Sequence, residues 1–131
     1  MALTTTTGFS SPLGAVLVIQ TSGTATSDND VTSGANLTLN VMEVSNSSSS
    51  TVFVKLYDHA TPTVGTTVPD LIFPIASGAT RTLNILNGSA NSGNGGYKFD
   101  TAISMATVTT AGTAGTGSPT GGNCKIVLIT T

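Results

Sequence analysis

Charged residues are scarce in this chain, and their scarcity excludes the classes of protein that depend on them. Of 131 residues, four are Lys or Arg and six are Asp or Glu, so 8% are charged and the formal net charge is −2. A typical soluble domain has about 25% charged residues. Four basic residues are too few for the positive surface that binds nucleic acid or an anionic membrane. We therefore expect neither a nucleic-acid nor a membrane partner.

Cysteine, histidine, tryptophan and long apolar runs are also scarce or absent. The single Cys124 can form neither an intrachain disulfide nor a cysteine-based zinc site, and it leaves the redox compartment open. The longest apolar run, residues 13–19, is far shorter than the ~20 residues that span a bilayer. The start of the chain lacks the basic residues of a secretory signal. We expect a small, soluble, single-domain protein without a cofactor or a metal.

What the chain does contain is typical of β-structure. There are 25 threonines and 15 serines, and Gly, Asn, Ser and Pro separate short apolar runs. No segment combines a cap with the 3.6-residue periodicity of a helix. The pattern predicts an all-β fold, a single antiparallel β-sandwich of about eight strands with jelly-roll or immunoglobulin-like topology. The predicted strands are residues 15–20, 36–44, 51–57, 70–75, 80–85, 97–99, 101–109 and 125–130.

Several of these strands carry a more detailed signal. Residues 15–20 form a continuous apolar run suited to burial on both faces. The apolar positions of residues 36–44 change phase near Val41, which predicts a bulge or a bend from sheet to sheet. Pro74 predicts an edge strand or a strand end. Residues 97–109 are either two strands or one bent strand.

Polar segments rich in Gly, Ser, Thr and Asn separate the strands. We predict exposed loops at residues 21–34, 87–96 and 111–122, and a fourth at residues 4–11. The fourth belongs to an N-terminal arm, residues 1–14, with the lone aromatic Phe9. The sandwich domain then spans residues 15–131.

His59 and Cys124 are the candidate catalytic side chains, and neither lies in a supporting motif. His59 follows Asp58, but the chain has no G-x-S-x-G nucleophile elbow. We expect a surface histidine at a strand end. Cys124 opens an apolar strand and is expected to be a small core residue. No catalytic, cofactor-binding or metal-binding residue is predicted, and the protein is not expected to be an enzyme.

Two other motifs carry little weight. The acidic stretch 28–30 begins like an EF-hand loop, but Ser33 and Leu39 stand where that loop needs Gly and Glu. A solvated loop is expected there, with an irregular oxygen-ligand site as the alternative. The glycosylation sequons at Asn36, Asn46 and Asn87 are about as many as chance gives in a chain this rich in Ser and Thr.

The composition of the surface points to a protein that works inside an assembly. Ten charged residues cannot cover the roughly 6,000 Å² that a folded chain of this mass exposes. Hydroxyls, amides and glycine must cover most of it, and such a surface repels its own copies weakly.

Residues 51–106 resemble a known family. The segment VFVKLYDHA at 52–60 leads into PTVGTTVP at 62–69, and LIFPI at 71–75 and Gly78 follow. A glycine-rich turn then precedes YKF at 97–99 and AISMA at 102–106. This order is similar to small virion proteins of tailed bacteriophages, above all cyanophage-like ones. Asp100-Thr101, where a glycine is usual, and the long 87–96 segment depart from the pattern.

The resemblance implies a non-enzymatic virion structural protein, a β-sandwich that decorates or cements a capsid. Its partner would be the major capsid protein, its place the capsid surface, and its own state a homo-oligomer, either a dimer or a trimer. The alternatives are a head or tail fibre or tail accessory protein, or a carbohydrate- or receptor-binding module. The arm and the stiff loop after residue 58 supply the candidate capsid contacts, namely Phe9, Leu13, Pro62, Val64 and Pro69.

Overall fold

The computed structural model describes residues 2–11, 14–85 and 96–131, and these residues form strands and no helix. The predicted all-β sandwich is confirmed, and all eight predicted strands are present to within two residues at either end. The strands are β1 (Leu3–Ser11), β2 (Gly14–Gln20), β3 (Leu37–Asn46), β4 (Val52–Asp58), β5 (Leu71–Ile75), β6 (Thr80–Asn84), β7 (Tyr97–Phe99), β8 (Ile103–Val108) and β9 (Cys124–Thr130).

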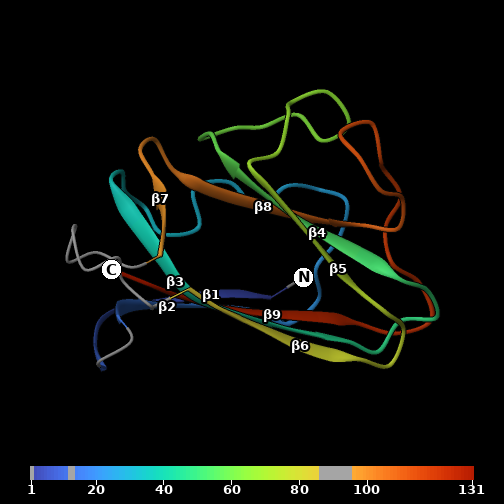
Figure 1. The fold of residues 1–131 in the computed structure, drawn as a ribbon, viewed down its shortest axis with the longest axis horizontal. Coiled ribbons are helices and arrows are strands. Elements are labelled where there is room, and N and C mark those ends of the chain that lie inside the picture. The colour runs from blue at the N-terminus through green and yellow to red at the C-terminus, as the bar shows by residue number, and fades with distance from the viewer. Residues whose placement is uncertain (1, 12–13, 86–95) are drawn as a thin grey trace.

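The strands form two antiparallel sheets packed face to face. The large sheet has the order β1-β2-β9-β3-β6, and β7 pairs with the first residues of β3. The small sheet has the order β5-β4-β8. The large sheet is the lower layer in Figure 1, and the small sheet lies above it.

The apolar core lies between the two sheets because alternate residues of each strand point inward. Val52, Val54 and Leu56 of β4 face the core, and all three are fully buried. The other buried core side chains are Val18, Val31, Leu39, Met42, Val44, Ile75, Phe99, Ile103, Met105, Cys124, Ile126 and Leu128.

Three irregularities predicted within the strands are resolved. The pairing of β3 with β9 shifts between Leu39 and Val41, which confirms the bulge and explains the change of apolar phase. Pro74 lies in β5, an edge strand of the small sheet, as predicted. Residues 97–109 form two strands in different sheets, and residues 100–102 connect them.

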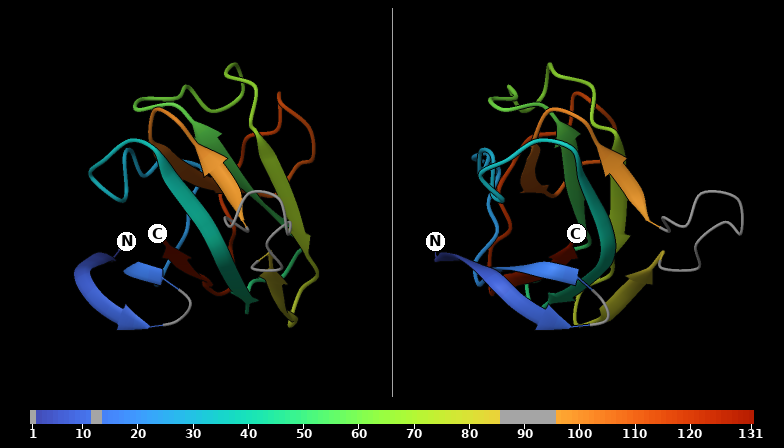
Figure 2. Two further views of the ribbon diagram at one scale, coloured as in Figure 1. Left: turned by 60° about the vertical axis from the view of Figure 1, so that its left-hand side comes forward. Right: turned by 90° about the vertical axis from the view of Figure 1, so that its left-hand side faces the viewer.

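Two predicted loops are wrong. Residues 4–11 belong to β1, which pairs with β2 along the margin of the large sheet (Figure 2). Residues 21–34 are not an exposed loop either, because Asp28, Val31 and Thr32 are buried there. This segment runs along the outer edge of β8 and bonds to its backbone, for example from the Thr107 N–H to Thr24 O at 2.8 Å. Of the predicted 87–96 loop, only Gly96 lies within the described residues.

Candidate functional site

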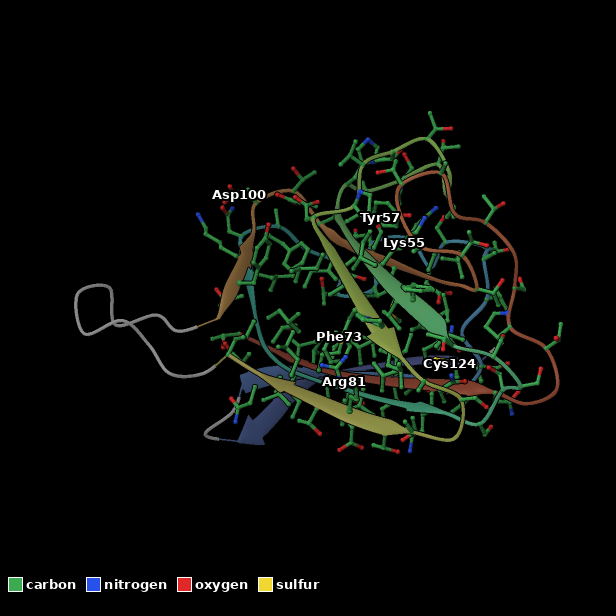
Figure 3. The ribbon with its side chains drawn as sticks, turned by 45° about the vertical axis from the view of Figure 1, so that its right-hand side comes forward. Lys55, Tyr57, Phe73, Arg81, Asp100 and Cys124 are labelled. Atoms are coloured by element: carbon green, nitrogen blue, oxygen red, sulfur yellow. The ribbon has the colours of Figure 1, made fainter. Side chains whose placement is uncertain are left out.

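The two candidate catalytic side chains lie in different surroundings. His59 is exposed after β4, where its Nδ1 accepts a hydrogen bond from the Thr61 N–H at 3.0 Å. Cys124 is fully buried at the start of β9 (Figure 3). Burial raises the pKa of the Cys124 thiol to about 11. The thiol is therefore protonated at neutral pH, and the expectation that Cys124 is a small core residue is confirmed.

The acidic stretch 28–30 closes the side of the sandwich. Asp28 is buried, its carboxylate accepts a hydrogen bond from Gln20 Nε2 at 2.7 Å, and its backbone pairs with Met105 of β8. Burial raises the pKa of Asp28, and the hydrogen bond from Gln20 offsets part of that rise. The expected solvated loop is therefore wrong at Asp28. Within the described residues, no three His, Cys, Asp or Glu side chains are grouped to hold a metal ion.

Asp58, at the end of β4, organises the connection between β7 and β8. Its Oδ1 accepts hydrogen bonds from the Thr101 N–H at 2.7 Å and the Ala102 N–H at 3.2 Å, and its Oδ2 from the Asp100 N–H at 3.0 Å. Burial alone would raise the pKa of Asp58, but these N–H groups lower it below its ordinary value. The carboxylate next to His59 therefore has a structural role.

The outer face of the small sheet is covered by the loops that leave it. Lys55 of β4 points to this face and is fully buried, and Figure 3 shows it between the sheet and the β8–β9 loop. Its Nζ donates to Thr113 O at 3.0 Å and Gly115 O at 2.7 Å, and burial lowers the pKa of the amine. Ser104 of β8 donates to His59 O at 2.6 Å, which fastens the β4–β5 loop to the same face. The chain thus buries both faces of β4 and β8.

The outer face of the large sheet is different, because apolar side chains lie there without a covering layer among the described elements. Leu17 and Ile19 of β2, Val127 and Ile129 of β9, and Val41 of β3 point away from the core and are half-buried. Their sequence neighbours Val18, Leu128 and Met42 are fully buried in the core. We call these five outward residues the open face. In Figure 1 the outer face of the large sheet is the underside of the lower layer.

The open face is continuous because its members are cross-strand neighbours. Leu17 lies opposite Ile129, which lies opposite Val41, and Ile19 lies opposite Val127. Directly opposed residues share a face and touch. The rows continue outward into uncharged or acidic side chains, which are Thr4 and Thr6 on β1, Glu43 on β3, and Thr82 and Asn84 on β6. The arrangement is an apolar strip with a mostly hydroxyl rim, which suits contact with another protein surface.

Three of the predicted capsid contacts lie in one loop. Pro62 is buried in the β4–β5 loop, and Val64 and Pro69 are half-buried in the same loop. This loop is closed by backbone hydrogen bonds from Thr66 and Thr67 to Thr63 O, at 3.1 and 2.8 Å.

The remaining two contact candidates precede β2 in the sequence. Phe9 lies in β1, and Leu13 lies outside the described residues. Val68, whose side chain is 71% exposed, is the most prominent apolar residue of the β4–β5 loop and was not among the predicted contacts.

The open face was also absent from the predicted contacts, although the sequence contains its signal. The runs at residues 15–19 and 126–129 are apolar at every position, whereas a strand with one buried face needs an apolar residue only at every second position. One set from each run fills the core, and the other set forms the open face.

The described chain contains no helix that is long and apolar enough to cross a membrane. Comparisons of the chain with family models, with curated proteins and with solved structures find no match. A function must therefore be assigned from the chain's own residues and their geometry.

Proposed function

We propose that this chain is a non-enzymatic structural protein that binds a larger protein assembly through the open face. The observation that carries the proposal is the strip of Leu17, Ile19, Val41, Val127 and Ile129 on a sheet whose other face already forms the core. The resemblance of residues 51–106 to virion proteins suggests which assembly. The partner would be the major capsid protein, and the role decoration or cementing of the capsid surface.

The energetics favour weak binding by a single copy. Full burial of an aliphatic side chain contributes about 1.5–3 kcal/mol, so completing the burial of a half-buried one contributes roughly 1 kcal/mol. Five such side chains give a gross contribution of roughly 5 kcal/mol. Association itself costs at least about 4 kcal/mol, so one open face supports only reversible binding. A decoration protein can use such faces because a repeated shell offers many sites and can engage linked copies together.

The scarcity of charge supports the same role. Two charged residues adjoin Val127: Glu43 lies opposite it on β3, and the exposed Lys125 lies two residues before it on the same side of β9. Docking therefore removes few charges from water, and removing charges is the largest penalty in forming a contact. Threonine hydroxyls at the rim can exchange water for hydrogen bonds with a partner.

A carbohydrate-binding module would need exposed aromatic rings that stack on sugars. The aromatic side chains that the structure describes are packed instead. Tyr57 and Phe99 are buried, the rings of Tyr97 and Phe99 lie 5.1 Å apart, and the Arg81 guanidinium covers Phe73 at 4.5 Å (Figure 3). A fibre or tail accessory protein would use the same open face and differs only in its place on the particle.

The copy number of the chain in purified source particles tests where on the particle the protein is located. Quantitative mass spectrometry against the most abundant shell protein should give a simple fraction of that protein, as expected for decoration. A much smaller number would move the protein to a fibre, collar or tail. Absence from the particles would rule out the virion role.

Paired substitutions test the face. The Val127→Thr/Ile129→Thr variant keeps two β-branched residues on β9 and removes apolar surface. We expect it to lower the affinity for particles from which the native protein has been removed by about tenfold or more, equal to roughly 1.4 kcal/mol. Ile72→Thr is the control, because Ile72 is 38% exposed on β5 of the small sheet. Equal binding by both variants and the unmodified protein would refute the open face as the docking surface.

A further inference from the structure

The edges of the two sheets are not closed in the same way. Residues 24–31 cover the outer edge of β8, where Asp28 and Met105 exchange two backbone hydrogen bonds and the Val31 N–H donates to Ile103 O at 2.8 Å. On β5, Pro74 lacks an N–H group and its carbonyl accepts a hydrogen bond from Arg81 Nη1 at 2.6 Å. Both edges of the small sheet are therefore blocked against a further strand.

The large sheet ends in β6 and the three-residue β7 on one side, both paired with β3, and in β1 on the other. β6 is five residues long and carries the charged Arg81, and both features discourage pairing. β1 is nine residues long, LTTTTGFSS, without a charge or a proline. The side chains of residues 2–7 are all exposed, and β1 pairs with β2 alone. Over Leu3–Thr7 the pairing of β1 with β2 is regular, and this part of the edge has no charge, proline or bulge; the irregularity in that pairing lies between Thr7 and Ser11.

The backbone direction identifies which groups of β1 face outward. Ala2 O accepts a hydrogen bond from the Thr21 N–H at 3.0 Å, so the backbone groups of Ala2 point toward β2. Backbone groups alternate sides along a strand. The N–H and C=O groups of Leu3, Thr5 and Thr7 therefore point to the free edge.

We infer that this edge pairs with β1 of a second copy, antiparallel and around a two-fold axis near Thr5. In that register Thr5 lies opposite Thr5 of the other copy, Leu3 lies opposite Thr7, and roughly six backbone hydrogen bonds form. The Thr5 side chain makes its own hydrogen bond, Oγ1 donating to Val31 O at 2.6 Å, and the backbone N–H and C=O of Thr5 remain for the pairing. The two large sheets become one sheet across the axis.

A second copy fits this edge because isologous pairing places each residue near its own symmetry mate. Any charge near the axis would face the same charge, and like charges directly opposite destabilise a strand pair. Residues 3–11 carry none. The register instead places Thr5 opposite Thr5 and Thr4 opposite Thr6, and such threonine pairs are favourable across antiparallel strands. The pairing also joins two open faces on one side of the sheet, although it does not depend on what those faces bind.

Charge variants at Thr5 test the pairing in the full chain. Sedimentation velocity over a concentration series should show a monomer–dimer equilibrium for the unmodified protein. Thr5→Lys and Thr5→Glu should each raise the dissociation constant at least about tenfold, because each puts like charges together at the axis. An equimolar mixture of the two variants should restore the dimer. Both variants lose the same hydrogen bond to Val31 O, so recovery in the mixture separates pairing from folding. Thr61→Lys, at an exposed position of the β4–β5 loop, is the matched control and should dimerise normally.

Several results would overturn the inference. The unmodified protein could remain monomeric up to about 1 mM, the weak end of specific association. It could form trimers or open chains, which an isologous edge cannot produce. The dimer could persist in Thr5→Lys, or the mixture of Lys and Glu variants could stay monomeric. Each of these outcomes excludes β1 pairing around Thr5.

Discussion

A single carboxylate, Asp58, holds the connection between the two sheets, and its replacement gives a sharp test of how the fold is stabilised. Residues 100–102 carry the chain from β7 in the large sheet to β8 in the small sheet. Three consecutive backbone N–H groups of this connection donate to Asp58. Asp58→Asn keeps the shape of the side chain but puts an NH₂ group where one carboxylate oxygen accepts a hydrogen bond.

The size of the effect follows from those three hydrogen bonds. A hydrogen bond to a charged group contributes about 1.5–3 kcal/mol, roughly twice a neutral one. The amide oxygen of Asn can keep two weaker bonds, and the third N–H then faces a donor. Because Asp58 is only partly buried, we expect Asp58→Asn to lower the free energy of unfolding at pH 7 by about 2 kcal/mol, near the lower end of the range for one hydrogen bond to a charged group.

The pH dependence separates the charge of Asp58 from its shape. The pKa of Asp58 is lower in the folded protein than the ordinary value of 3.8. Its ionised form therefore stabilises the fold above the unfolded pKa, and this contribution disappears as the pH falls through the folded pKa. The difference between the unmodified protein and Asp58→Asn should be full at pH 7 and should shrink below about pH 4.

Urea denaturation at neutral and acid pH measures both quantities. Glu43→Gln is the control, since Glu43 is exposed on β3 and its hydrogen bond from Thr82 Oγ1 is long, at 3.4 Å. It should change the free energy of unfolding by less than about 0.5 kcal/mol. An Asp58→Asn effect as small as this control, or an effect equally large at acid pH, would refute the role of the charge.

Three further predictions concern the buried polar groups. Asp28→Asn should stabilise the protein at pH 7 by up to about 1 kcal/mol, because burial raises the pKa of Asp28 and its ionised form costs stability there. This gain should vanish as the pH falls through the pKa of Asp28. Urea denaturation at pH 7 and at acid pH measures it, and a gain that does not change with pH, or a loss of stability at pH 7, would contradict the prediction. Cys124 should react with a thiol reagent at least roughly 100-fold faster in urea than in the native protein, since the thiol is buried with a pKa of about 11. Fast native reaction would contradict that burial. Lys55→Met should lower stability by about 2 kcal/mol and speed protease cleavage within residues 109–122, because Thr113 O and Gly115 O lose their donor; unchanged cleavage would show that Lys55 does not hold this loop.

The strands could be predicted from the sequence where one face of a strand is apolar and the other polar. β6 alternates Arg81 and Leu83 with threonines, and β4 keeps Val52, Val54 and Leu56 on one face. The phase change near Val41 predicted a bulge, because a residue inserted into one strand shifts every later side chain to the other face. These signals are local, so they survive without knowledge of the partner strand.

The missed elements lack such local signals. β1 begins with four threonines after Leu3, and both faces of its described part are exposed, so no alternation marks it as a strand. The segment 21–34 is polar, yet its backbone closes the edge of β8, and backbone pairing leaves no trace in side-chain chemistry. The role of Asp58 depends on which residues the register of the small sheet brings to the end of β4. No spacing along the chain contains that information.

The open face shows how a feature of the sequence can be understood correctly and its consequence missed. The run at residues 15–20 predicted burial on both faces, and the described chain buries one face of β2 in the core and leaves Leu17 and Ile19 half-buried on the other. On the small sheet, by contrast, the chain covers the outer face with its own loops through Lys55 and Ser104. A β-sheet buried on both faces has near-continuous apolar strands, and β2 and β9 have that composition. Under the proposed function, a partner protein seated on the open face supplies the second layer that this composition favours.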